Sequence, residues 1–107
     1  MEFRSSTYTV DDRPVVAVEG VVDLVAVPVV RDLFQRLLRE HAGDTLVIDL
    51  DGVTTFDDCG LGVLVGAAAT ARERGGDVEL VCTAGALRDR LAVTRLDQLF
   101  TVRESAA

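Results

Sequence analysis

The sequence contains no lysine and no tryptophan, and it has little cysteine, proline or aromatic content. Aromatic residues make up 5% of its 107 residues, so we expect a core of Val, Leu and Ala. Two cysteines are too few for the disulfide framework of a small secreted protein. No apolar run approaches the roughly 18 residues that a membrane span needs, and the first residues lack a signal-peptide core. We therefore expect a cytoplasmic protein that does not enter a membrane.

Acidic residues outnumber basic ones by 18 to 11, which gives a net charge of −7. This charge argues against direct nucleic-acid binding, which requires a basic face. It is compatible with a partner that carries a basic patch, and equally with solubility alone. All basic side chains are Arg, so a phosphate-binding P-loop lysine is excluded, and two cysteines with one distant His do not form a zinc site. We expect neither a metal nor a cofactor.

The hydrophobic pattern predicts one α/β domain over residues 1–107, in the order β-β-α-β-α-β-α. A turn at 11–14 separates two strands that pair as a hairpin. Apolar runs predict one strand that ends at Val10 and three more over 15–18, 46–50 and 78–82. Helical spacings predict helices over 28–41, from 61 to the basic residues at 72–74, and over 86–91. The remaining segments are a connection over 20–23, an apolar segment over 96–100 followed by a short strand, and a frayed tail over 104–107.

Strand–helix–strand units require parallel strands joined by right-handed crossovers. The prediction is therefore a mixed sheet of four to five strands, with the hairpin as its antiparallel edge and about three helices packed on it. Functional groups of such sheets gather at the carboxyl ends of the strands, where residues 56–62 lie.

Asp57 and Asp58 stand where the strand over 46–50 leads into a helix. A helix N-terminus has free N–H groups and a partial positive charge, so one interpretation is that one of these acids caps the helix. Two adjacent acids exceed what a cap needs, and the alternative is that they bind a partner. Gly60 and Gly62 are interpreted as packing residues that let the helix approach the sheet.

Cys59 lies at the predicted helix start, where a thiol becomes more acidic, and Cys82 ends the next strand. If these strands are neighbours, both sulfur atoms lie at the same end of the sheet, although inert buried thiols remain the simpler interpretation. His41 is expected to be solvated at a helix end. An enzyme is not expected, because the chain offers no base for the thiol, no metal ligands and no cofactor loop.

Residues 57–66, Asp-Asp-Cys-Gly-Leu-Gly-Val-Leu-Val-Gly, resemble the Asp-Ser-Ser/Thr-Gly-Leu-Gly-Val-Leu signature of STAS-domain anti-sigma factor antagonists. Residues 20–23, Gly-Val-Val-Asp, are similar to that family's Gly-Glu-Leu-Asp, and the element order matches throughout. The resemblance implies a STAS-like fold. It also implies a protein that binds an anti-sigma factor, often a serine kinase of the GHKL type, and thereby frees a sigma factor.

The resemblance also implies a partner-binding surface made of Asp23, Thr55, Asp57, Asp58, Cys59, Gly60 and Leu61. In the family, the kinase phosphorylates the serine after the motif aspartate, and the added negative charge ends the complex. Asp58 occupies that position here, and Cys59 the next, so control by serine phosphorylation is in doubt. Asp58 either imitates the phosphorylated state or complements an unusual basic partner.

Two alternatives remain open within the same family. The first is a thiol switch in which oxidation of Cys59, alone or with Cys82, replaces phosphorylation. The second is a scaffold module of a stressosome-like complex. A monomer and a homodimer are both compatible with the sequence.

Overall fold

The chain begins with a hairpin of β1 (Phe3–Val10) and β2 (Arg13–Val22) in the computed structural model, which describes residues 3–83 and 85–106. Asp11 and Asp12 both adopt left-handed φ angles, 51° and 65°, and form a two-residue turn whose twist matches that of the strands. The predicted turn over 11–14 is therefore too long, and Pro14 belongs to β2. Pairing of β2 with β3 starts at Val15, so the missing N–H of Pro14 interrupts no bond to that strand.

The remaining elements alternate between helices and strands until the last part of the chain. They are α1 (Val27–Glu40), β3 (Thr45–Phe56), α2 (Asp58–Glu73), β4 (Asp77–Val81), α3 (Ala86–Val93), α4 (Leu96–Leu99) and β5 (Thr101–Arg103). Pro28 lies in the first turn of α1, where its missing N–H costs no helical bond.

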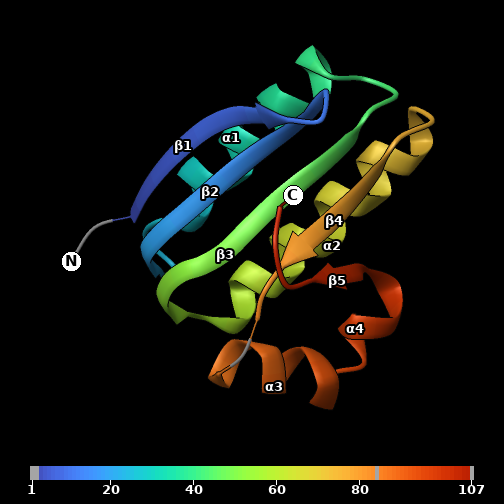
Figure 1. The fold of residues 1–107 in the computed structure, drawn as a ribbon. Coiled ribbons are helices and arrows are strands. Elements are labelled where there is room, and N and C mark those ends of the chain that lie inside the picture. Colours follow the sequence, from blue (N-terminus) through green and yellow to red (C-terminus); the bar gives the residue numbers. More distant parts are fainter. Residues whose placement is uncertain (1–2, 84, 107) are drawn as a thin grey trace.

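The five strands form one sheet in the order β1-β2-β3-β4-β5, antiparallel between β1 and β2 and parallel elsewhere. Figure 1 shows α1 and α2 side by side on one face, and α3 and α4 at the end where β3 and β4 finish. The main core lies between the sheet and α1 with α2, and it is made mainly of Val, Leu, Ala and Phe side chains, with Ile48 and Cys82. The predicted mixed α/β sheet with an antiparallel hairpin edge is confirmed.

Several predicted boundaries are wrong because the sequence pattern reveals only the apolar part of each strand. Residues 20–22, predicted as a connection, belong to β2, and two register irregularities after Ala17 and Gly20 let β2 continue beside β3. β3 likewise extends beyond Leu50 to Phe56 through exposed polar residues. β4 ends one residue before Cys82, and the segment over 96–100 forms α4, so the structure has four helices in its described part.

The face of the sheet opposite α1 and α2 carries a small second cluster of Val15, Val47 and Val81. Ala106 packs against this cluster, and Figure 1 shows the end of the chain crossing that face. The predicted fraying therefore does not apply to Ala106, whose methyl group covers apolar surface. Ala107 lies outside the described residues.

Gly60 allows α2 to lie directly against the end of β3. A Cβ atom at this position would be 2.7 Å from the ring of Phe56, closer than real Cβ contacts occur. The packing interpretation is thus confirmed for Gly60. It is wrong for Gly62, because a Cβ there would meet nothing within 4 Å.

We predict that Gly60→Ala lowers the free energy of unfolding by about 1–3 kcal/mol, since the added methyl overpacks the Phe56 ring. Gly66→Ala is the matched control, because Gly66 is exposed within α2 and its Cβ would also meet nothing within 4 Å. Because Ala has a higher helix propensity than Gly, Gly66→Ala should raise the free energy of unfolding by roughly 0.5–1 kcal/mol. Urea denaturation midpoints measure both changes, and equal effects of the two substitutions would refute the proposed Gly60–Phe56 contact.

Candidate functional site

The carboxyl ends of β2 and β3 lie side by side, which brings two separate loops together. Val22 is in register with Phe56, and the backbone N–H of Asp57 donates a hydrogen bond of 2.9 Å to the carbonyl oxygen of Val22. The Thr54 hydroxyl donates to the Gly20 carbonyl oxygen at 3.1 Å. These bonds fix the segment that follows β2 against the start of α2.

Asp23 holds the turn that leads from β2 into α1. Its carboxylate accepts a hydrogen bond of 3.0 Å from the Ala26 N–H, and its carbonyl oxygen accepts from Ala26 and Val27. The turn leaves Leu24 and Val25 pointing away from the core, with 72% and 84% of their surfaces exposed. Asp23 therefore positions an exposed apolar pair beside the start of α2.

Asp57 is the N-cap residue of α2, with an extended backbone at φ −75° and ψ 159°. Its side chain makes no capping hydrogen bond, so the predicted carboxylate cap is wrong in this respect. Within the first turn of α2 its carbonyl oxygen accepts a hydrogen bond of 2.9 Å from the Gly60 N–H. Among residues 3–83 and 85–106, the Asp57 carboxylate has no hydrogen bond or ion pair, and it is exposed.

Asp58 differs from Asp57 because its carboxylate is paired. The guanidinium of Arg90, on α3, donates to the Asp58 carboxylate at 2.5 Å and also donates to the carbonyl oxygen of Phe56. Asp58 remains 91% exposed at its side chain, whereas Arg90 is 34% exposed. Arg90 thus directs the Asp58 carboxylate toward α3 and places a cation next to it.

The sequence pattern did not indicate Arg90 as a site residue, because the place of its short helix in the fold cannot be derived from the pattern alone. It also missed the exposure of Leu24 and Val25, which apolar residue types do not indicate. The signal for both was weak: an apolar pair in a connection, and one Arg on a helix of eight residues.

The other residues that the resemblance assigned to partner binding divide into surface and interior. Thr55 is exposed and Cys59 half-buried at the same end of the sheet, whereas Gly60 and Leu61 are buried within the first turn of α2. Thr55, Asp57, Asp58 and part of Cys59 are therefore accessible at this end of the sheet, and Gly60 and Leu61 are not.

Both cysteines are free thiols. Cys82 is buried and lines a cleft of about 200 Å³ between the end of β3 and α3, together with Val53, Phe56, Leu87 and Arg90. Burial raises the pKa of the Cys82 thiol, the carboxylate of Asp51 raises it further, and Arg88 opposes both effects. This environment disfavours the reactive thiolate at Cys82.

His41 terminates α1 as its C-cap residue and is half-buried, with its Nδ1 atom 3.8 Å from the Asp44 carboxylate. It lies at the opposite end of β3 from Asp57. Within the described ranges, His, Cys, Asp and Glu side chains form no group of three that would hold a metal ion. None of the described helices is long and apolar enough to cross a membrane.

Comparison with known proteins identifies this arrangement. The family model described as Mlab, STAS domain matches residues 6–102.

Three solved structures share the fold over nearly the whole chain. An anti-sigma factor antagonist from Mycobacterium paratuberculosis is 24% identical, with a TM-score of 0.88, covering 98% of this chain and 88% of the other. A putative antagonist from Thermotoga maritima is 19% identical, with a TM-score of 0.84 and coverages of 95% and 87%. The phosphorylated form of SpoIIAA from Bacillus is 16% identical, with a TM-score of 0.71 and coverages of 97% and 93%. The structural similarity, expressed by these TM-scores, shows that the chain shares the fold of these proteins.

We predict that Cys82 reacts with iodoacetamide much more slowly than Cys59 at neutral pH, because it is buried and its raised pKa keeps it protonated. As the pH rises past the usual pKa of a thiol, Cys82 loses its proton in the unfolded chain before it does so in the folded protein. The contribution of this thiol to the free energy of unfolding therefore falls as the pH rises. In the Cys59→Ser variant, mass spectrometry follows the alkylation of Cys82 alone. Alkylation of Cys82 as fast as that of a fully exposed cysteine would contradict its burial.

Proposed function

Because the chain belongs to the STAS domain family, we propose that it is an anti-sigma factor antagonist, which binds an anti-sigma factor and thereby releases a sigma factor. Structural neighbours that are described as anti-sigma factor antagonists support this role. In this proposal the protein acts in the cytoplasm as a binding protein, not as an enzyme. It regulates transcription by partner switching.

One observation carries the proposal: two loops present exposed apolar and acidic side chains on one surface. We define the docking face as Asp23, Leu24, Val25, Thr55, Asp57, Asp58 and Cys59. The backbone bond from Asp57 to Val22 joins its two halves. Exposed apolar residues next to charged ones are typical of protein-binding surfaces, where the apolar part supplies affinity and the charges supply orientation.

The electrostatics of the docking face favour a partner with a basic patch. The Asp57 carboxylate is exposed and forms no ion pair within the described residues, and the whole chain has a net charge of −7. An anti-sigma factor with a GHKL-type serine kinase domain is the partner that the family resemblance suggests. In this interface Asp57 would supply the free negative charge, and Leu24 with Val25 the apolar anchors.

Asp58 stands where the family carries its phosphorylated serine, but it is a poor imitation of a phosphate in this setting. A phosphoserine carries about two negative charges at neutral pH, and Asp58 carries one. Arg90 pairs with that charge and holds it toward α3. We therefore propose that Asp58 leaves the protein competent to bind its partner, with no need for a phosphatase.

The thiol switch remains a second hypothesis, supported by Cys59, which is half-buried within the docking face. The burial and raised pKa of Cys82 make it an unfavourable second thiol, so modification of Cys59 alone is the version that the structure favours. Measuring the intact mass after oxidant treatment tests the thiol switch, and slow, unselective oxidation would exclude it.

The stressosome-like scaffold is the other alternative. It predicts a large assembly, which size-exclusion chromatography would reveal.

The first test is calorimetric titration with the anti-sigma kinase domains encoded in the same genome. We expect binding at micromolar concentration or tighter, and we expect Asp58→Arg to weaken it by about tenfold or more, roughly 1.4 kcal/mol, by placing a second cation next to Arg90. Asp97→Arg is the control with the same charge change, because Asp97 is exposed on α4 away from the docking face. If both variants bind like the wild type, the proposed face is wrong.

The second test asks whether Arg90 keeps Asp58 compatible with binding. Arg90→Gln frees the Asp58 charge at the position where an added phosphate ends the complex in the family, and it should weaken partner binding by about three- to tenfold; stronger binding would show that the basic patch of the partner contacts Asp58 itself. The same change in an Asp58→Ser background should have little effect. The double-mutant cycle cancels the contribution of the Arg90–Phe56 bond. An equal loss in both backgrounds would show that Arg90 acts independently of Asp58.

A further inference from the structure

The outer edge of β1 is long and unpaired within the described part of the chain. β1 has eight residues, pairs only with β2, and is exposed over residues 4–9. It contains no proline and no bulge relative to β2. Such an edge offers backbone donors and acceptors to another strand unless it is blocked.

The hairpin determines which groups point outward. Because its turn has two residues, Val10 and Arg13 form a pair that exchanges backbone hydrogen bonds, and alternate pairs back along the strand do the same. The backbone groups of Arg4, Ser6 and Tyr8 are therefore used by β2. Those of Ser5, Thr7 and Thr9 point away from the sheet and are available.

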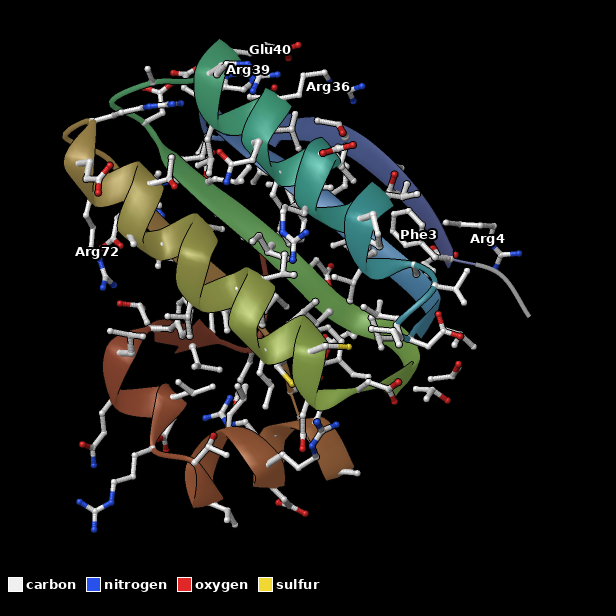
Figure 2. All side chains as sticks on the ribbon, turned by 180° about the vertical axis from the view of Figure 1, so that it is seen from behind. Phe3, Arg4, Arg36, Arg39, Glu40 and Arg72 are labelled. Atoms are coloured by element: carbon white, nitrogen blue, oxygen red, sulfur yellow. The ribbon has the colours of Figure 1, made fainter. Side chains whose placement is uncertain are left out.

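A groove of about 600 Å³ runs beside this edge, under α1. Phe3 and Ser5 line it from β1, and one stripe of α1 lines it from above: Val29, Asp32, Leu33, Gln35, Arg36 and Arg39. In Figure 2 Phe3 lies near the beginning of α1, and Arg36 and Arg39 lie toward its other end. The stripe thus carries an acid in its first half and two cations in its second half.

We infer that this edge pairs antiparallel with the β1 edge of a second copy of the chain, so that two sheets join into one of ten strands. A two-fold axis perpendicular to the sheet keeps the helices of both copies on the same face. Residues that face each other across the two β1 strands then have their side chains on the same face of the joined sheet, so their numbers are both odd or both even. With the axis at Ser6, the outward pairs Ser5 with Thr7 and Phe3 with Thr9 exchange hydrogen bonds.

On the other face of the sheet, this register places Arg4 of one copy opposite Tyr8 of the other. Tyr8 is 42% exposed, although it is the only tyrosine and sits on an edge strand. Within its own copy Arg4 forms an exposed ion pair with Glu19 at 3.3 Å, and its guanidinium over the Tyr8 ring of the other copy would add a favourable cation–π contact. The pairing therefore covers an aromatic side chain that is exposed in one copy.

The charges on α1 are complementary to themselves under the same axis. The two-fold operation sets the α1 helices antiparallel across the joined groove. Asp32 of each copy then faces Arg36 of the other, whose ion pair with Glu40 of its own helix is exposed and long, at 3.8 Å. The stem of Arg39 faces Val29. An acidic partner strand would satisfy Arg36 and Arg39 but not Asp32, so a second copy is the better match.

None of the docking-face residues lines this groove. The dimer is therefore independent of the proposed antagonist role, and each copy keeps its docking face accessible.

Sedimentation equilibrium of the full chain tests the dimer. We expect a monomer–dimer equilibrium, which Thr7→Pro weakens at least tenfold by removing an outward N–H that β2 does not use. Thr7→Val keeps that N–H and should dimerise like the wild type. Circular dichroism melting confirms that each variant is folded.

Charge reversal tests the register of α1. Asp32→Arg and Arg36→Asp should each weaken the dimer, and the double variant should restore it. A wild type that stays monomeric up to about 0.5 mM would overturn the inference, since weak dimers with dissociation constants in that range remain visible. So would a dimer insensitive to both Thr7→Pro and the single charge reversals, because it would use another surface.

Discussion

The parallel pairing of β2 with β3 is the constraint on which the candidate site depends. It continues past the apolar half of both strands to the pair Val22–Phe56, and the Asp57 N–H extends it by one more bond to Val22. Two loops that are more than thirty residues apart in sequence are thereby held together at one end of the sheet. Without this extension, the turn at Asp23 and the start of α2 would have no fixed relation, and no common surface would exist.

A second constraint acts on the same end of the sheet from α3. Arg90 contacts both the last carbonyl oxygen of β3 and the Asp58 carboxylate, so one guanidinium connects three elements. The two adjacent acids consequently differ in character: Asp57 presents an uncompensated charge, and Asp58 presents one that is already paired. This difference is the physical basis for treating Asp58 as compatible with partner binding. Gly60 completes the arrangement by letting α2 lie close to the Phe56 ring.

The sequence predicted the fold class, the hairpin edge and the position of the Asp57–Asp58 turn, because apolar runs and helical spacings are direct consequences of burial. It did not predict the polar half of β3 or the end of β2, since backbone pairing holds these residues without burying their side chains. Of the two interpretations of the adjacent acids, the carboxylate cap is wrong, because the Asp57 side chain makes no capping hydrogen bond and the Asp58 carboxylate pairs with Arg90. Arg90 and the exposed Leu24–Val25 pair required knowledge of which residues from distant segments meet.

The most direct test of the central claim is to observe which residues a partner touches. The backbone amide signals of the isotope-labelled protein would be recorded by NMR during titration with the anti-sigma kinase domain that binds in calorimetry. The account predicts that the largest shifts occur at Leu24, Val25 and residues 55–59, with a smaller response at Arg90. Shifts concentrated on the face of the sheet opposite α1 and α2, around Val47 and Val81, would contradict it.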